Sequence, residues 1–195
     1  MTGRRFLAAC MLVAGVLGAV PPAAAQLEGP VPAGQVTTGT LSFDGHASVG
    51  DFTGTTHEVT GEMSAAATLA EVRGWVEAPV RSLETGNKKR DRDLNKSMES
   101  DRYPAIRFEL TGVTPGGGTA DSAAATLAGR LLIHGVTREV SLPAVIRASA
   151  EGIRVRTDFP LDLKDYEIGG LTKMLGMLRM QERIEVRVDV TFATR

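Results

Sequence analysis

The feature that most constrains the fold of this chain is a strict alternation of apolar and polar residues that recurs in several segments. Over residues 184–192 every second residue is apolar, and the residues between them are charged or polar. The same period of two recurs over residues 153–163 and 106–110. Because successive side chains of an extended strand point to opposite faces, each segment has one apolar and one wet face. The pattern predicts half-buried antiparallel strands.

Weaker alternation earlier in the chain, and between these segments, indicates further strands separated by turns. We expect a turn at Gly50–Gly54 and a hairpin at His134–Arg138. The count is about eight strands joined by short connections, which favours an up-and-down antiparallel β-barrel over a parallel sheet. The additional expected strands cover residues 40–49, 55–64, 72–80, 123–133 and 139–148.

Two segments break the alternation and predict one or two short helices. Residues 87–101 are highly charged, with Leu94 and Met98 four residues apart, as on the inner side of a short surface helix. In Gly169–Met180 the apolar residues fall at helical spacing, and this segment is rich in methionine, which adapts to varied apolar partners. Such a helix would be either a lid that touches a ligand or a plug that seals one end of the barrel.

The N-terminal residues 1–25 have the features of a cleaved signal peptide. Arg4 and Arg5 precede an apolar run, and Ala23–Ala25 fits a small-residue cleavage site. We therefore expect cleavage after Ala25 and a periplasmic or secreted protein, with 26–39 as a linker or loose first strand and 40–195 as the barrel domain. The paired arginines leave open whether export follows the general secretory or the twin-arginine route.

The composition excludes several classes of chemistry. The single cysteine, Cys10, would leave with the signal peptide, so the mature chain has no disulfide and no thiol nucleophile. The chain is mildly acidic, with a formal net charge of −1, so we expect no nucleic-acid partner. The three histidines, His46, His57 and His134, lack metal-ligand spacing, and no nucleophile motif is present. We expect no enzyme, no catalytic residue, no bound metal and no cofactor.

The inner face of the expected barrel carries many small residues, and only 5% of the chain is aromatic. An eight-stranded barrel is just wide enough to be filled by side chains or to hold one small ligand. Two interpretations remain open: the small residues leave a cavity, or they fit a tight, filled barrel. The small residues expected to face inward are Ala65, Ala67, Gly74, Ala78, Ala123, Ala125, Ala144 and Ala148.

Several short motifs, taken in order, carry a family resemblance. They are Thr85-Gly86, Arg90-Asp91, the segment Tyr103–Phe108 with its Tyr-Pro-x-Ile-x-Phe pattern, and the turn Gly135–Arg138. Their order and spacing resemble the YceI-like polyisoprenoid-binding family, over about residues 40–192. The resemblance implies an eight-stranded antiparallel lipocalin-like barrel whose apolar lumen binds long isoprenoid lipids such as polyprenyl quinones. Where many members have paired aromatics, this chain has Ser97–Ser100, which implies a different wall at one end of the lumen.

The predicted ligand-binding residues are apolar and face inward, with a methionine-rich group at one end. Arg90 and Asp91 match the family's Arg-Asp pair, and they form either a polar rim that grips a head group or a structural clasp. The predicted lumen residues are Ile106, Phe108, Leu131, Ile133, Val155, Phe159, Val186, Val188, Met174, Met177 and Leu178.

The function that follows is an exported protein that holds an isoprenoid or other long apolar lipid for transport, storage or sequestration. The alternative is a filled barrel that acts as a stress-linked protein-interaction module without lipid. A third, enzymatic interpretation would require a polar pocket near His46 or His134. Expected partners are an apolar lipid such as a polyprenyl quinone, a membrane in transient contact, and a second copy of the chain through an exposed strand edge.

Overall fold

The computed structural model is mostly β-strand, with one α-helix and three short 3-10 helices among the residues it describes. None of the helices within this part of the chain is long and apolar enough to cross a membrane. The predicted signal peptide lies outside the described residues. The described residues are 29–48, 50–119, 121–168, 172–173 and 178–194.

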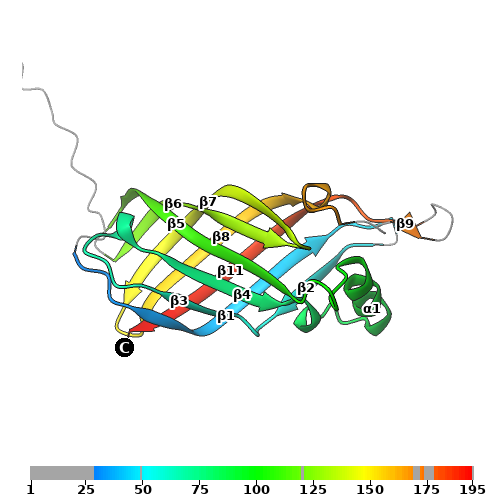
Figure 1. Ribbon diagram of the computed structural model, residues 1–195, viewed down its shortest axis with the longest axis horizontal. Coiled ribbons are helices and arrows are strands. Elements are labelled where there is room, and N and C mark those ends of the chain that lie inside the picture. Colours follow the sequence, from blue (N-terminus) through cyan, green and yellow to red (C-terminus); the bar gives the residue numbers. More distant parts are fainter. Residues whose placement is uncertain (1–28, 49, 120, 169–171, 174–177, 195) are drawn as a thin grey trace, which may run out of the picture.

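Eight antiparallel strands form a closed barrel (Figure 1). Closure comes from β11, which pairs with β8 on one side and with β1 on the other, in a register running from Gly34 opposite Thr194 to Asp44 opposite Glu185. This confirms the predicted eight-stranded barrel. Its strands are β1 (Gly34–Gly45), β3 (Thr60–Met63), β4 (Gly74–Pro79), β5 (Ala105–Gly118), β6 (Ser122–Ile133), β7 (Val136–Ser149), β8 (Gly152–Asp162) and β11 (Arg183–Thr194).

A ninth strand, β2 (Phe52–Thr56), lies outside the barrel and pairs with the second half of β1. The predicted turn at Gly50–Gly54 is therefore wrong from Phe52 onward, and the single strand expected at 55–64 is two strands. The break has a local cause. The Thr56 hydroxyl accepts a hydrogen bond from the Glu58 backbone N–H at 3.0 Å, which turns the chain between β2 and β3.

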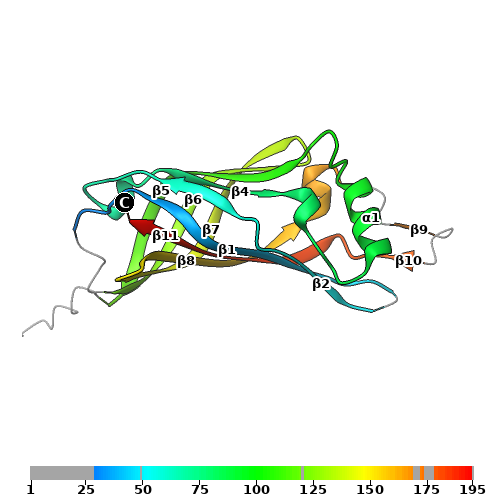
Figure 2. The same cartoon turned by 90° about the horizontal axis from the view of Figure 1, so that it is seen from below.

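The predicted charged helix is α1 (Lys88–Ser97), at one end of the barrel (Figures 1 and 2). It begins after Asn87, whose side-chain oxygen accepts from the N–H groups of Lys89 and Arg90, as an N-cap requires. Leu94 and Met98 pack against the core as predicted. The 3-10 helices are η1 (Leu69–Glu71), η2 (Val80–Ser82) and η3 (Leu163–Tyr166).

The second predicted helix, over Gly169–Met180, is wrong where this segment is described. Thr172–Lys173 (β9) pairs antiparallel with Leu178–Arg179 (β10) in a small separate sheet at the α1 end (Figure 2). Residues 169–171 and 174–177 lie outside the described residues. A short apolar run satisfies helical and extended periods about equally well, so spacing alone could not distinguish them.

The predicted hairpin at His134–Arg138 joins β6 to β7 through two residues, His134 and Gly135, with φ of 51° and 77°. Positive φ at both positions is the hallmark of the tightest hairpin turn, which favours glycine. A side chain at Gly135 would also collide with the Tyr103 ring. The Tyr103 and Gly135 motifs, thirty-two positions apart in the chain, are therefore one packing unit.

Candidate ligand-binding lumen

The inner face of the barrel surrounds a cavity of about 350 Å³. Eight of the predicted lumen residues lie on its wall, two from each of β5, β6, β8 and β11. That they contact a ligand stays a prediction. They are Ile106, Phe108, Leu131, Ile133, Val155, Phe159, Val186 and Val188.

The cavity extends along the barrel. Its wall includes Leu94 of α1 and Met98, the residue that follows α1, and also Leu69 of η1. The helices α1 and η1 lie at opposite ends of the barrel (Figure 1). Several inward-facing wall residues, such as Val155 and Val188, are only half-buried although they sit within paired strands. Their accessible surface belongs to the cavity, so the barrel is not filled by its own side chains.

The small residues expected to face inward fall into two groups. Five are inside the barrel: Gly74 and Ala78 line the cavity, and Ala123, Ala125 and Ala144 are buried. The prediction is wrong for the other three, which are exposed. The reason is where the strands end. Ala65 and Ala67 come after the end of β3, and Ala148 lies near the end of β7, next to the turn that leads to β8. The exposed residues are Ala65, Ala67 and Ala148.

Thr157 places a hydroxyl group inside this apolar wall. It lies in the middle of β8, is 7% exposed, and faces the cavity between Val188 of β11 and Ala144 of β7. Its Oγ1 has no hydrogen-bond partner among the described residues. An unpaired buried hydroxyl is unfavourable, so this position differs chemically from the apolar residues that surround it in the wall.

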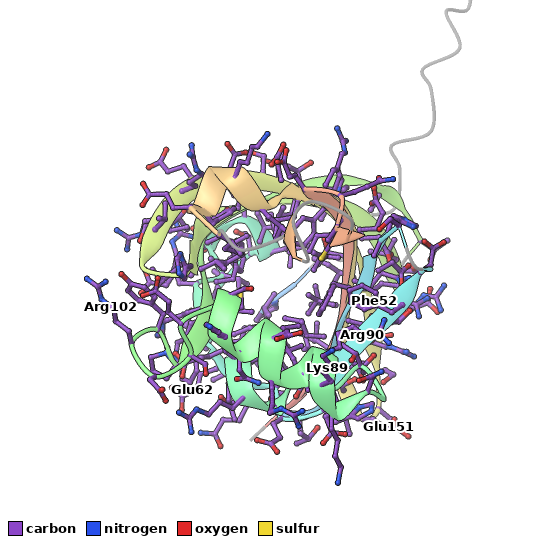
Figure 3. The ribbon with its side chains drawn as sticks, turned by 90° about the vertical axis from the view of Figure 1, so that its right-hand side faces the viewer. Phe52, Glu62, Lys89, Arg90, Arg102 and Glu151 are labelled. Atoms are coloured by element: carbon purple, nitrogen blue, oxygen red, sulfur yellow. The ribbon has the colours of Figure 1, made fainter. Side chains whose placement is uncertain are left out.

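Arg90 brings a positive charge to the α1 end of the lumen. Its guanidinium lies 4.2 Å from the centre of the Phe52 ring, and the two side chains lie side by side in Figure 3. The Arg90 Nε is buried without a hydrogen-bond partner among the described residues, and the side chain is part of the cavity wall. The contact attaches α1 to β2 and leaves guanidinium N–H groups at the lumen's end.

Asp91 points elsewhere, as expected for adjacent residues of a helix. Its Oδ1 accepts hydrogen bonds from the Thr85 backbone N–H at 2.9 Å and from the Thr85 hydroxyl at 2.6 Å. It therefore fixes the turn that precedes α1. Of the two interpretations of the Arg-Asp pair, Asp91 has the geometry of a clasp, and Arg90 has the position of a rim residue.

The methionine-rich end of the predicted site is only partly described. Met174 and Met177 lie outside the described residues, and for Leu178 the structure gives the backbone of β10 but not the side chain. Met180, which follows β10, does line the cavity and forms a β-bridge with Ala47. The prediction that this segment contacts a ligand therefore stays a prediction.

The three histidines do not converge. The His46 Nδ1 lies 2.9 Å from an Asp51 carboxylate oxygen, and the His57 Nδ1 lies 3.1 Å from the Thr40 hydroxyl. His134 is buried and shares a hydrogen bond with a backbone carbonyl on η3. No cluster of three potential metal ligands occurs among the described residues. None of the three histidines lines the lumen.

The outer face of the barrel carries paired charges. Arg154 donates two hydrogen bonds to the Asp189 carboxylate, at 2.7 and 2.6 Å, and Arg156 lies 3.2 Å from it. The Arg154 hydrogen bond is the main reason that the pKa of Asp189 lies below its usual 3.8. These ion pairs join β8 to β11 on the solvent-exposed face that the alternation of apolar and polar residues predicted.

Sequence reasoning omitted part of the wall. Most of the omitted residues share the alternation of the predicted ones, so the same signal would have found them. Leu69, Leu83 and Ile168 also line the cavity but lie outside the barrel strands, where alternation gives no signal. Met98 is of particular interest because it lies in Ser97–Ser100, the segment predicted to give a different wall. Further wall residues are Leu41, Phe43, Val76, Leu127, Leu142, Ile146, Leu161, Ile184, Val190 and Phe192.

Comparison with known proteins gives a consistent result. A family model described as a YceI-like domain matches residues 33–192. BcnA of Burkholderia cenocepacia superposes with a TM-score of 0.66 at 14% identity, covering 78% of this chain and 94% of that chain. A polyisoprenoid-binding domain from Saccharophagus degradans, implicated in plant cell wall breakdown, gives 0.66 at 14% identity, covering 85% and 99%. At such identities these structures show the fold alone. No curated protein matches the chain.

Proposed function

Because the chain belongs to the YceI-like family, we propose that it is an exported binding protein that holds an isoprenoid or other long apolar lipid in its lumen. The observation that carries the proposal is the cavity inside the closed barrel, with wall residues from one end to the other. Its volume, about 350 Å³, lies within the range of small-molecule sites. A filled barrel working only through its surface would have no such space.

The binding energy would come from burial of the hydrocarbon chain. Each buried methylene contributes about 0.8 kcal/mol, so each five-carbon isoprene unit contributes about 4 kcal/mol before the cost of ordering the chain. A hydrocarbon tail needs no hydrogen bonds, which fits a wall in which most side chains are apolar. A polyprenyl quinone would fit with its tail in the lumen and its carbonyl groups near the Arg90 guanidinium.

The remaining expectations belong to the same proposal. Export to the periplasm or to the medium rests on the predicted signal peptide, residues 1–25. We propose binding without catalysis, since neither His46 nor His134 faces the lumen. The edge strand β2 is bridged on its outer side by backbone hydrogen bonds between Thr55 and Glu84, which leaves less free strand edge for the expected homodimer.

The proposal is tested by titrating the delipidated protein with three ligands: a short-chain polyprenyl quinone, the matching polyprenyl alcohol, and the quinone without its tail. We expect the two tail-bearing ligands to raise the melting temperature by roughly 5–10 °C at a hundredfold excess over Kd. The tail-less quinone should have little effect. Absence of a shift with both tail-bearing ligands, or an equal shift with the tail-less quinone, would overturn the proposal.

A further inference from the structure

The helix at the end of the lumen carries an excess of positive charge on an acidic protein. α1 contains five cationic and two acidic side chains, a formal charge of +3 within ten residues. The whole chain has a formal net charge of −1. The charge of this one helix is therefore opposite in sign to that of the molecule.

The cations of α1 are gathered on one face. With 3.6 residues per turn, successive residues are about 100° apart, so Lys88, Arg92 and Lys96 follow one another along a single stripe, with Lys89 at its edge. All four side chains are exposed. Leu94, which lines the cavity, lies on the opposite side of the helix. The cationic face therefore points away from the lumen.

This face lacks the counter-charges found elsewhere on the barrel. On the barrel wall, Arg154 pairs with Asp189 and Arg130 pairs with Glu109. None of the ion pairs found among the described residues involves these cations of α1, although Asp93 lies about one turn from Lys89 and from Lys96. Like charges one turn apart destabilise a helix, so this arrangement costs stability unless an anionic surface neutralises it. The cations of this face are Lys88, Lys89, Arg92 and Lys96.

The position of α1 adds a second argument. The helix lies across the end of the barrel, with Arg90 turned toward Phe52 and Lys89 on the side facing the viewer (Figure 3). An apolar ligand that passed this end would come from or go to a phase that dissolves it, and for a lipid that phase is a bilayer. Many bilayers carry anionic head groups, which attract clustered lysine and arginine side chains.

We propose that the outer face of α1 docks this end of the barrel on the surface of an anionic lipid bilayer. The contact is peripheral and electrostatic, made by the four cations with lipid phosphates. It would bring the lumen's end to the membrane so that a ligand could move between the two with little exposure to water. That transfer role rests on the proposed function, whereas docking itself does not.

The test is vesicle co-sedimentation of the purified protein with two vesicle types, pure phosphatidylcholine and phosphatidylcholine containing phosphatidylglycerol. We expect binding only to the anionic vesicles, and loss of binding at 1 M salt, where the screening length falls to about 3 Å. The triple variant K88Q/R92Q/K96Q should bind the anionic vesicles on the order of a hundredfold more weakly, since each cation contributes roughly fivefold.

The matched control is R130Q/R147Q/R156Q, which removes the same charge from exposed positions on the barrel wall. It should bind anionic vesicles nearly as well as the unmodified protein, and circular dichroism should show both variants folded. Equal weakening by the two variants, equal binding to both vesicle types, or no binding to either would overturn the proposal. Because vesicle binding is measured without cargo, an empty lumen would refute the proposed function and leave this result intact.

Discussion

The Thr157→Val substitution tests whether the lumen is apolar and free of water. Thr157 is buried in the middle of β8 and its hydroxyl has no hydrogen-bond partner among the described residues. Valine has nearly the same shape, so the substitution removes the polar group without leaving a cavity. Valine also favours an extended strand. The change should therefore isolate the cost of the unpaired hydroxyl.

The magnitude follows from the burial of that group. An unsatisfied buried hydroxyl costs about 1–3 kcal/mol relative to its hydrated state in the unfolded chain. Thr157 faces a cavity rather than a packed core, so we take the lower end of that range, about 1 kcal/mol. For a chain of this size, such a gain raises the melting temperature by roughly 2–4 °C.

The assay is urea unfolding of the delipidated protein, followed by circular dichroism, with the free energy obtained by linear extrapolation. The control is Thr126→Val, the same substitution on the exposed outer face of β6. The control should change the free energy of unfolding by no more than about 0.5 kcal/mol. The Thr157→Val protein should also bind a polyprenyl alcohol at least as tightly as the unmodified protein.

The opposite result would refute the reasoning. If Thr157→Val lowered the free energy of unfolding by 1 kcal/mol or more while Thr126→Val did not, the hydroxyl must have a partner in the empty protein. That partner would be water inside the lumen, and a wet lumen would weaken the argument from burial of a hydrocarbon chain.

Three further predictions concern the lumen, the clasp and the outer face. Val188→Trp should narrow the lumen and weaken binding of a polyprenyl alcohol more than tenfold, measured by calorimetry, because loss of two buried methylenes of the ligand is enough for that change. The control Val145→Trp, on the exposed face of the barrel, should leave Kd unchanged, and equal effects of the two variants would contradict the lumen as the binding site. Asp91→Ala should lower the free energy of unfolding by about 2 kcal/mol, because it removes the two hydrogen bonds that Thr85 donates to the carboxylate. A change below about 0.5 kcal/mol would show that the contact between Asp91 and Thr85 is dispensable for stability. Because the folded-state pKa of Asp189 is depressed, the stabilisation from its ion pair is present above about pH 3.8 and is lost as pH falls through the lower folded pKa. Asp189→Asn should therefore flatten the dependence of the free energy of unfolding on pH in this range, and an unchanged dependence would contradict the role of the ion pair.

Much of the barrel could be predicted from the sequence because alternation is a local property with a global consequence. The period of two at residues 184–192 decides which side chains face inward, whatever the strand pairs with. The eight inward residues predicted on β5, β6, β8 and β11 therefore lie on the cavity wall. Helix α1 was predictable for a similar reason, since Leu94 and Met98, which indicated its inner side, lie about one turn apart.

What could not be predicted depends on contacts between distant segments. The place where β2 leaves the barrel depends on Thr56, whose hydroxyl serves the local backbone instead of extending the strand. The Arg90 contact with Phe52 joins residues thirty-eight positions apart, and no spacing rule relates them. That the Thr157 hydroxyl has no partner within the described part of the chain is visible only when the neighbouring strands are placed around it.

The most direct test of the central claim is native mass spectrometry of the protein purified under native conditions from the cells that produce it, followed by extraction and identification of any bound lipid. The account predicts a complex with one long apolar molecule per chain, which dissociates on collisional activation to leave the mass of the bare protein. A protein that is empty as purified, and that still shows no complex after incubation with polyprenyl quinones, polyprenyl alcohols and fatty acids, would contradict it.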